Sequence, residues 1–366
     1  MTNRLDNPLQ NSAVKSRQIA FFAAFVLPVY KLLETPSLLA RFAKGDLLVP
    51  AFLHFVVQAA LLSLLVYAAS RSETSLFERL NAWLGKWSAL IYALLALYFL
   101  CIAVLPLLDL EKFVYAVFYD TSPTVFSFAA FFIFAAFACT KGLKTVGRSA
   151  DLSLFLFLPA FLLLVAMSFP ATKPDNLLPL FGESAKSTLD AFAYTTPHFA
   201  DAVFLLPLIG NLRYQKGDGK KIVVGYGVGA AFVLVFLCVF FGLYSTIAPR
   251  EHYAFSKIAQ YFPVLSIVGR IDLIFVYMLC VVLFFYVAAP LQYTVYFGAK
   301  IAHTTRKTSI SAIVCFGAFL FVLFCNKHYN AIYALFCETL FPVFLFLSIG
   351  LPVACSLFNH KENRHA

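Results

Sequence analysis

The sequence predicts an all-α integral membrane protein with ten transmembrane helices, arranged as an inverted five-plus-five repeat with broken first and sixth helices. Hydrophobic residues make up 61% of the 366 residues and charged residues only 13%, whereas soluble domains are roughly half apolar and a quarter charged. Apolar stretches of about 20 residues, the length needed to cross a bilayer, recur along the whole chain. Two of these stretches, in corresponding positions of the two halves, are interrupted by proline and ionisable residues, as in proteins whose broken helices form a substrate site.

Ten candidate spans follow one another with short polar connections. They cover residues 18–42, 47–69, 87–108, 123–140, 149–170, 191–212, 222–247, 263–292, 309–325 and 331–357. The fourth and ninth are short, and the eighth is long enough to tilt or to leave the membrane. Five spans per half is an odd number, so the halves must insert with opposite orientation. We therefore predict repeat one at 18–170 and repeat two at 191–357, between cytoplasmic tails at 1–17 and 358–366.

The distribution of basic residues predicts the orientation of these spans. If the N-terminus is cytoplasmic, most of the 28 Lys and Arg residues fall on the cytoplasmic side, and the alternation holds at almost every loop. Both termini are therefore predicted to be cytoplasmic, and the net charge of +10 reflects topology and not a nucleic-acid partner. A cleaved signal peptide is the alternative for the first apolar run. However, the apolar character resumes after Pro36, and the charge asymmetry requires this span to be retained.

The first span cannot be one continuous lipid-facing helix. Its stretch LPVYKLLETPSLLARF contains Pro28 and Pro36, which each remove a helix hydrogen bond, and Lys31 and Glu34, whose charges would lie near the bilayer centre. An outer half-helix that begins near residues 34–37 would offer free N–H groups and a positive dipole end to a ligand carboxylate. In the alternative interpretation, Lys31 and Glu34 neutralise each other across one helical turn so that the broken helix can insert.

The sixth span is interrupted in a similar way by two prolines, with His198 and Asp201 between them. Asp201 is a candidate acceptor for a ligand ammonium group, and His198 is a candidate protonation switch, although a lone histidine is more often simply hydrogen-bonded. A solvated position at the outer end of the span is the alternative for both. The candidate ligand-binding residues of the two broken spans are Tyr30, Lys31, Glu34, Thr35, Ser37, His198 and Asp201.

Other polar or small residues within the spans are interpreted as structural. His54 and Gln58 lie four apart on one face of the second span, which favours interhelical hydrogen bonds, and the glycines of GYGVG in the seventh span favour close helix packing. The eight cysteines lie in or beside apolar runs without CxxC spacing, so neither a metal site nor a disulfide scaffold is expected. No HExxH or GxSxG pattern occurs, and we expect neither an enzyme nor a bound cofactor.

Four sequence patterns, in order along the chain, carry a family resemblance. They are PSLLARFAKGDLLVPAFL with Pro36, Ala40, Gly45 and Asp46; KGLKTVGRSADLSLFLFLP with Gly142 and Arg148; DNLLPLFG with Asn176 to Pro179 and Gly182; and GRIDLIF with Arg270 and Asp272. Together they resemble the spore germination permease family, the B subunits of spore germinant receptors, within the amino acid–polyamine–organocation superfamily. The chain departs from the family where Val29 and Tyr30 occupy the place of a Gly-Thr pair, and where Gly269 replaces an acidic residue.

The resemblance implies a function and a set of partners. It implies a membrane subunit of a germinant receptor in the spore inner membrane that binds a small nutrient at the broken helices, and an amino acid is the expected nutrient. Such a subunit acts with A-type and C-type receptor subunits. A proton-coupled amino acid transporter of the cell membrane and a purely structural subunit are the alternatives, because a fold alone does not separate these functions.

Overall fold

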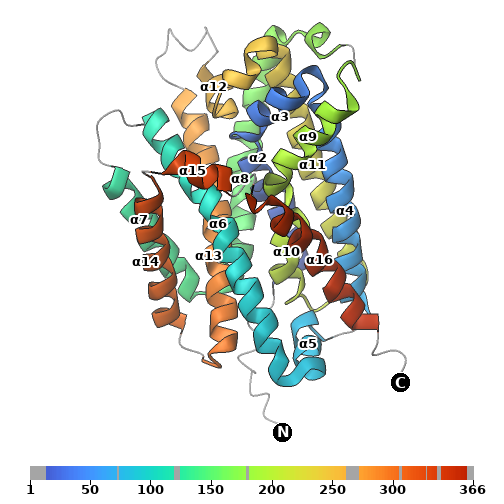
Figure 1. The fold of residues 1–366 in the computed structure, drawn as a ribbon, viewed down its shortest axis with the longest axis vertical. Helices are drawn as coiled ribbons and strands as arrows, with labels where there is room; N and C mark the ends of the chain where they lie inside the picture. The colour runs from blue at the N-terminus through green and yellow to red at the C-terminus, as the bar shows by residue number, and fades with distance from the viewer. Residues whose placement is uncertain are drawn as a thin grey trace.

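The computed structural model describes residues 14–71, 74–118, 124–178, 181–260, 272–304, 307–326, 328–335 and 339–360. Throughout these ranges every regular element is a helix (Figure 1). Six helices are long and apolar enough to cross a membrane, and a bent pair at the start of the described chain makes a seventh candidate span. These helices identify a multi-pass membrane protein. Side chains such as Leu97, Phe137 and Phe316 are more than half exposed, as expected of surfaces that face lipid.

The long helices stand side by side and carry most of the apolar core. They are α4 (Leu48–Ser70), α6 (Ser88–Phe118), α8 (Leu143–Ser168), α11 (Asp218–Tyr244), α13 (Asp272–Ile301), α14 (Lys307–Asn326) and α16 (Phe341–His360). The shorter helices are α1 (Ser16–Phe21), α2 (Leu27–Lys31), α3 (Thr35–Ala43), α5 (Leu76–Leu84), α7 (Thr124–Thr140), α9 (Ala185–Thr195), α10 (Asp201–Ile209), α12 (Ala254–Gln260) and α15 (Tyr329–Ala334). In Figure 1, α3 and α12 lie at the upper end of the bundle and α5 at the lower end.

Single turns of 3-10 or π geometry connect or interrupt several helices. They are η2 (Phe22–Val26), η3 (Lys44–Asp46), η4 (Gly85–Trp87), η5 (Phe169–Ala171), η6 (Pro174–Leu177), η7 (Thr196–Phe199) and η8 (Ser245–Arg250). The turn η2 has π geometry and directly precedes α2, whose second residue is Pro28. The missing N–H of Pro28 cannot continue the helical ladder. The turn η7 separates α9 from α10, so the apolar stretch predicted as the sixth span is two short helices joined end to end.

The first predicted span is broken where the sequence places the break. The helices up to Lys31 and those from Thr35 onward meet at an angle of 61°. Pro36 lies in the first turn of α3, where its missing N–H costs nothing. The carbonyls of Leu32 and Leu33 accept hydrogen bonds from the first N–H groups of α12, at 3.2 and 2.9 Å. These bonds satisfy backbone groups that the break would otherwise leave unpaired within the membrane.

Several predicted spans differ in their bounds from the helices of the structure. The eighth was expected at 263–292. Its first part, 263–271, lies outside the described residues, and α13 (Asp272–Ile301) continues past 292, because aromatic rings surround Lys300 near its end. The third continues past 108, because two tyrosine hydroxyls bind the carboxylate of Asp109 inside the bundle. The region of the tenth contains the separate helices α15 and α16. Arg270 of the GRIDLIF pattern lies outside the described residues.

The structural interpretations of the second and seventh spans are confirmed. His54 Nε2 lies 3.0 Å from the Phe192 carbonyl oxygen on α9, and Gln58 Oε1 accepts a hydrogen bond of 3.0 Å from the N–H of Ala202 on α10. A Cβ added at Gly225 or Gly229 would overlap the backbone of the first span, whereas Gly227 faces open space. The first and third glycines of GYGVG therefore allow close helix packing, and the second does not contribute.

Candidate functional site

A buried ion pair joins the two broken spans. Lys31 Nζ lies 2.6 Å from Asp201 Oδ1, and the two side chains are 1% and 4% exposed. Lys31 is the last residue of α2 and Asp201 the first of α10, so each charge lies at the end of a short helix whose dipole favours it. Lys31 forms no ion pair with Glu34, and the interpretation in which those two residues neutralise each other is therefore wrong.

The ion pair is completed by neighbours from a third helix and from the turn η7. The Tyr226 hydroxyl of α11 donates a hydrogen bond of 2.9 Å to Asp201 Oδ2, so both oxygens of this carboxylate are occupied. The ammonium group of Lys31 lies 5.4 Å from the ring centroid of Phe199, within reach of a cation–π interaction. A ligand ammonium that binds Asp201 must therefore displace groups that are already in place.

A row of stacked rings extends from the first broken span across the bundle. Tyr30 stacks on His198 at a centroid distance of 5.3 Å and on Tyr286 of α13 at 5.0 Å, and Tyr286 stacks on Phe204 of α10 at 4.8 Å. The Tyr30 hydroxyl donates a hydrogen bond of 2.6 Å to Asp109 Oδ2 on α6. The row therefore links both broken spans to α6 and α13.

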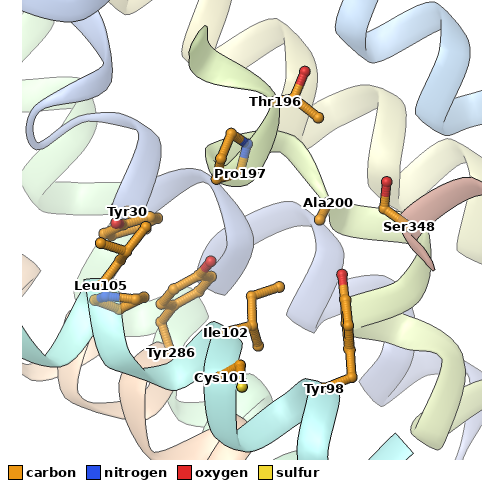
Figure 2. Close-up of a pocket in the computed structure, with 11 residues that line it drawn as sticks. Tyr30, Tyr98, Cys101, Ile102, Leu105, Thr196, Pro197, Ala200, Tyr286 and Ser348 are labelled. Carbon is orange, nitrogen blue, oxygen red and sulfur yellow. The ribbon is translucent and has the colours of Figure 1, made fainter. Parts of the chain in front are cut away.

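A cavity of about 20 Å³ lies beside this row of rings. Figure 2 shows Tyr30 and Tyr286 on one side of the space and Thr196, Pro197 and Ala200 from the break of the sixth span on another. The remaining lining residues are Tyr98, Cys101, Ile102, Leu105 and Pro106 of α6, and Ser348 of α16. This volume holds about one water molecule. The cavity thus marks where both breaks meet, but it is closed to anything much larger.

Two polar side chains of the broken segments are buried without a hydrogen bond. His198 is 2% exposed and Thr35 is fully buried. Among the described residues, neither ring nitrogen of His198 nor the Thr35 Oγ1 has a hydrogen-bond partner. Unpaired buried polar groups are rare in native structures, and each one calls for an explanation such as a bound water, ion or ligand. Within the described ranges, no group of three or more His, Cys, Asp or Glu side chains is placed to hold a metal ion.

The other predicted residues take different positions. Ser37 donates its hydroxyl hydrogen bond to the Glu34 carbonyl oxygen at 2.8 Å, which closes the first turn of α3. The Glu34 carboxylate is largely buried and interacts electrostatically with Asp109 and Tyr253. Burial, with a further contribution from the Glu34 and Asp109 carboxylates, raises the pKa of the Tyr253 phenol, which lies between α11 and α12. All seven predicted residues thus lie at or beside the two breaks.

Sequence reasoning missed the partners that the other helices supply. Asp109 stands in the apolar run LPLLDLEKF, and an ionisable residue in such a run is a functional candidate by default, so a signal was present. Tyr226 and Tyr286 carried no comparable signal, because tyrosines are frequent in this chain and only the fold brings these two to the breaks.

Comparison with known proteins places these helices in a family. The family model described as "Spore germination protein" matches residues 48–332, which is more than three quarters of the chain. The match includes His198, Asp201, Asp109 and Tyr286, whereas the first broken span precedes it. No curated protein matches the chain.

Proposed function

Because this chain belongs to the spore germination protein family, we propose that it is the membrane subunit of a spore germinant receptor. In this proposal it binds a small nutrient, an amino acid, at its two broken helices and has no enzymatic activity. The family and the apolar helices make it a germination-related, multi-pass membrane protein. We further propose that the chain forms a ten-span inverted repeat with both termini in the cytoplasm. In this proposal it lies in the spore inner membrane and acts with A-type and C-type partner subunits.

One observation supports a ligand site at the broken helices. The unpaired polar groups of His198 and Thr35 lie in the two segments whose breaks meet at the cavity. An amino acid supplies both hydrogen-bond donors and acceptors. Thr35 opens α3, whose first N–H groups lack intrahelical partners and whose dipole favours an anion. We therefore assign the ligand carboxylate to the start of α3.

Two carboxylates, those of Asp201 and Glu34, are candidate acceptors for the ligand ammonium group. Asp201 already binds Lys31 and Tyr226. Glu34 is adjacent to Thr35, and within the described part of the chain its carboxylate accepts no hydrogen bond. Because the ammonium and carboxylate groups of an α-amino acid are attached to one carbon, Glu34 is the acceptor that a carboxylate at Thr35 favours.

The size of the cavity suggests how binding becomes a signal. A cavity of about 20 Å³ is too small for an amino acid, so binding requires its walls to move apart. These walls come from α2, α6, α13, α16 and the turn η7. A ligand that binds only the opened arrangement shifts the equilibrium toward it, and partner subunits that contact these helices would respond to the shift.

A proton-coupled amino acid transporter is the second candidate function. It is favoured by Glu34 and Asp109, two buried acids that interact electrostatically and are suited to exchange a proton. A carrier must release its ligand on the far side of the membrane, whereas a receptor subunit needs only different affinities in two states.

The two functions are separated by uptake and by germination. We expect purified protein in liposomes to show no concentrative amino acid uptake under a proton gradient. We expect spores of a deletion strain to lose germination on the nutrient, while vegetative growth on the same nutrient is unchanged. Gradient-driven uptake that Asp109→Asn abolishes, together with normal germination of the deletion strain, would establish the carrier instead.

A further inference from the structure

A second, larger cavity lies at the other end of the bundle from α3. It has a volume of about 470 Å³ and is formed where α5 joins α6 and where α13 ends, at the lower end of Figure 1. Its polar lining residues include Asn81, Lys86, Ser88, Lys300 and His303, and none of the residues that line it is acidic. This end of the bundle is the one that the charge distribution predicts to be cytoplasmic.

Lys300 is a positioned cation without a contacting counter-ion. Its Nζ lies 4.6 Å, 5.0 Å and 4.9 Å from the ring centroids of Phe77, Tyr92 and Tyr296, which fix the ammonium group through cation–π attraction. The acid that attracts it is Glu78, but the Glu78 carboxylate accepts a hydrogen bond from the Ser75 N–H. Within the described ranges Lys300 forms no ion pair.

The rest of the lining also offers donors to an anion. The side-chain oxygen of Asn81 accepts a 2.7 Å hydrogen bond from Tyr92, so the amide NH₂ remains the available part of that side chain. Lys86 is exposed and has no ion-pair partner among the described residues. Gly85 and His303 both adopt positive φ, at 52° and 47°, so tight turns bound the cavity, and a Cβ added at Gly85 would meet nothing within 4 Å. Ammonium and amide donors around open space are suited to a phosphate group.

The surroundings of the cavity favour a lipid as the source of that phosphate. Trp83 and Trp87, the two tryptophans of the chain, lie within two residues of the lining residues Asn81, Gly85, Lys86 and Ser88 in the sequence and are 48% and 72% exposed. Tryptophan is enriched at the membrane–water interface. The exposed leucines of α6, Leu90, Leu94 and Leu97, follow at helical spacing from the cavity into the apolar part of the bundle. They form a track on which an acyl chain can lie while the headgroup occupies the cavity.

We propose that this cavity binds the phosphate group of an anionic phospholipid, held by Lys86 and Lys300, with its acyl chain along the exposed leucines of α6. Basic pockets between transmembrane helices on the cytoplasmic side are suited to such headgroups, and each lysine near the surface contributes about 1 kcal/mol. The site is separate from the broken spans, and the proposal does not rest on the proposed germinant.

The two tryptophans make the test direct. The full chain is reconstituted in nanodiscs that contain increasing fractions of brominated phosphatidylglycerol or brominated phosphatidylcholine, and quenching of tryptophan fluorescence is measured. We expect half-maximal quenching at a lower fraction of phosphatidylglycerol than of phosphatidylcholine. Lys86→Gln and Lys300→Gln should each reduce this preference about fivefold. The matched control is Lys220→Gln, an exposed lysine at the start of α11 with the same change of charge.

The outcomes separate the possible sources of the phosphate. Equal quenching by both lipids, or an equal effect of Lys86→Gln and Lys220→Gln, overturns the lipid site. Lys300 is surrounded by three aromatic rings, so Lys300→Gln could unfold the chain. Lys86 is exposed, so Lys86→Gln leaves the packing intact and tests the site independently. Millimolar inorganic phosphate or glycerol phosphate should not reverse the quenching. If these soluble anions alter tryptophan fluorescence at low concentration while phosphatidylglycerol shows no preference, the phosphate site stands and its lipid source is wrong.

Discussion

Removal of one partner of the Lys31–Asp201 pair should destabilise the protein far more than removal of both. The ammonium and carboxylate groups are 2.6 Å apart and almost fully buried. In Asp201→Ala, Lys31 would keep only the Leu27 carbonyl oxygen at 3.5 Å and the Phe199 ring, and the Tyr226 hydroxyl would lose its acceptor. In Lys31→Met, Asp201 would keep its hydrogen bond from Tyr226 and the favourable end of α10.

The structure gives the size and order of these effects. Leaving a buried charge uncompensated costs about 3–5 kcal/mol. We expect Asp201→Ala near the upper end of that range and Lys31→Met near the lower end, because the remaining aspartate retains better support. The double variant removes both charges, so it should cost less than the sum of the two single variants by about 3 kcal/mol.

The assay is unfolding of the purified chain in mixed micelles with increasing SDS, followed by helical circular dichroism. The control pair is Lys257 and Glu251, whose groups are 3.7 Å apart on partly exposed side chains; its coupling should lie below about 1 kcal/mol. Suppose that the single variants of Lys31 and Asp201 each lower the free energy of unfolding by less than about 1 kcal/mol, and that their effects simply add. Water then reaches these charges, and the closed geometry of the breaks is wrong.

Three further predictions test other parts of the structure. His198→Phe keeps a ring stacked on Tyr30 but removes both unpaired nitrogens. Spores that carry this variant at the normal protein level should need at least about tenfold more nutrient to germinate. An unchanged dose–response would exclude the imidazole from the site. Asp46→Ala removes the acceptor of two backbone N–H groups in the loop before α9. The free energy of unfolding should therefore fall by about 1.5–3 kcal/mol, and proteases should cut this loop faster. Unchanged stability and unchanged cleavage would show that these two hydrogen bonds do not form. A reporter fused after Lys144 should indicate the cytoplasm and one after Lys173 the outer side; a cytoplasmic signal at Lys173 contradicts the inverted repeat.

The break in the first span could be predicted from the sequence because its causes are local. Two prolines and two charges within one apolar stretch are incompatible with a continuous membrane helix, and the 61° bend falls between Lys31 and Thr35. The same holds for His54, whose spacing from Gln58 indicated one helix face, and both side chains contact neighbouring helices.

The partner of Lys31 could not be predicted, because pairing depends on long-range packing. Glu34 is three residues away in sequence and was the only partner that the sequence suggested, as an alternative interpretation. Asp201 is 170 residues away and is brought close only by the meeting of the two breaks. Helix ends were misjudged for a related reason. Hydropathy ends a span at its polar residues, but Asp109 and Lys300 continue their helices because tyrosine hydroxyls and aromatic rings accommodate them.

The most direct test of the proposed germinant site is to fill the cavity between the breaks. Ala200 lines this cavity, and Ala200→Leu would occupy its space; the control is Ala60→Leu on the exposed face of α4. Spores that carry either variant at wild-type protein level are compared for germination across nutrient concentrations. We predict that Ala200→Leu requires at least about tenfold more nutrient, a loss of about 1.4 kcal/mol, and that Ala60→Leu responds like the wild type. Identical dose–response curves for the two variants would contradict a nutrient site at the broken helices.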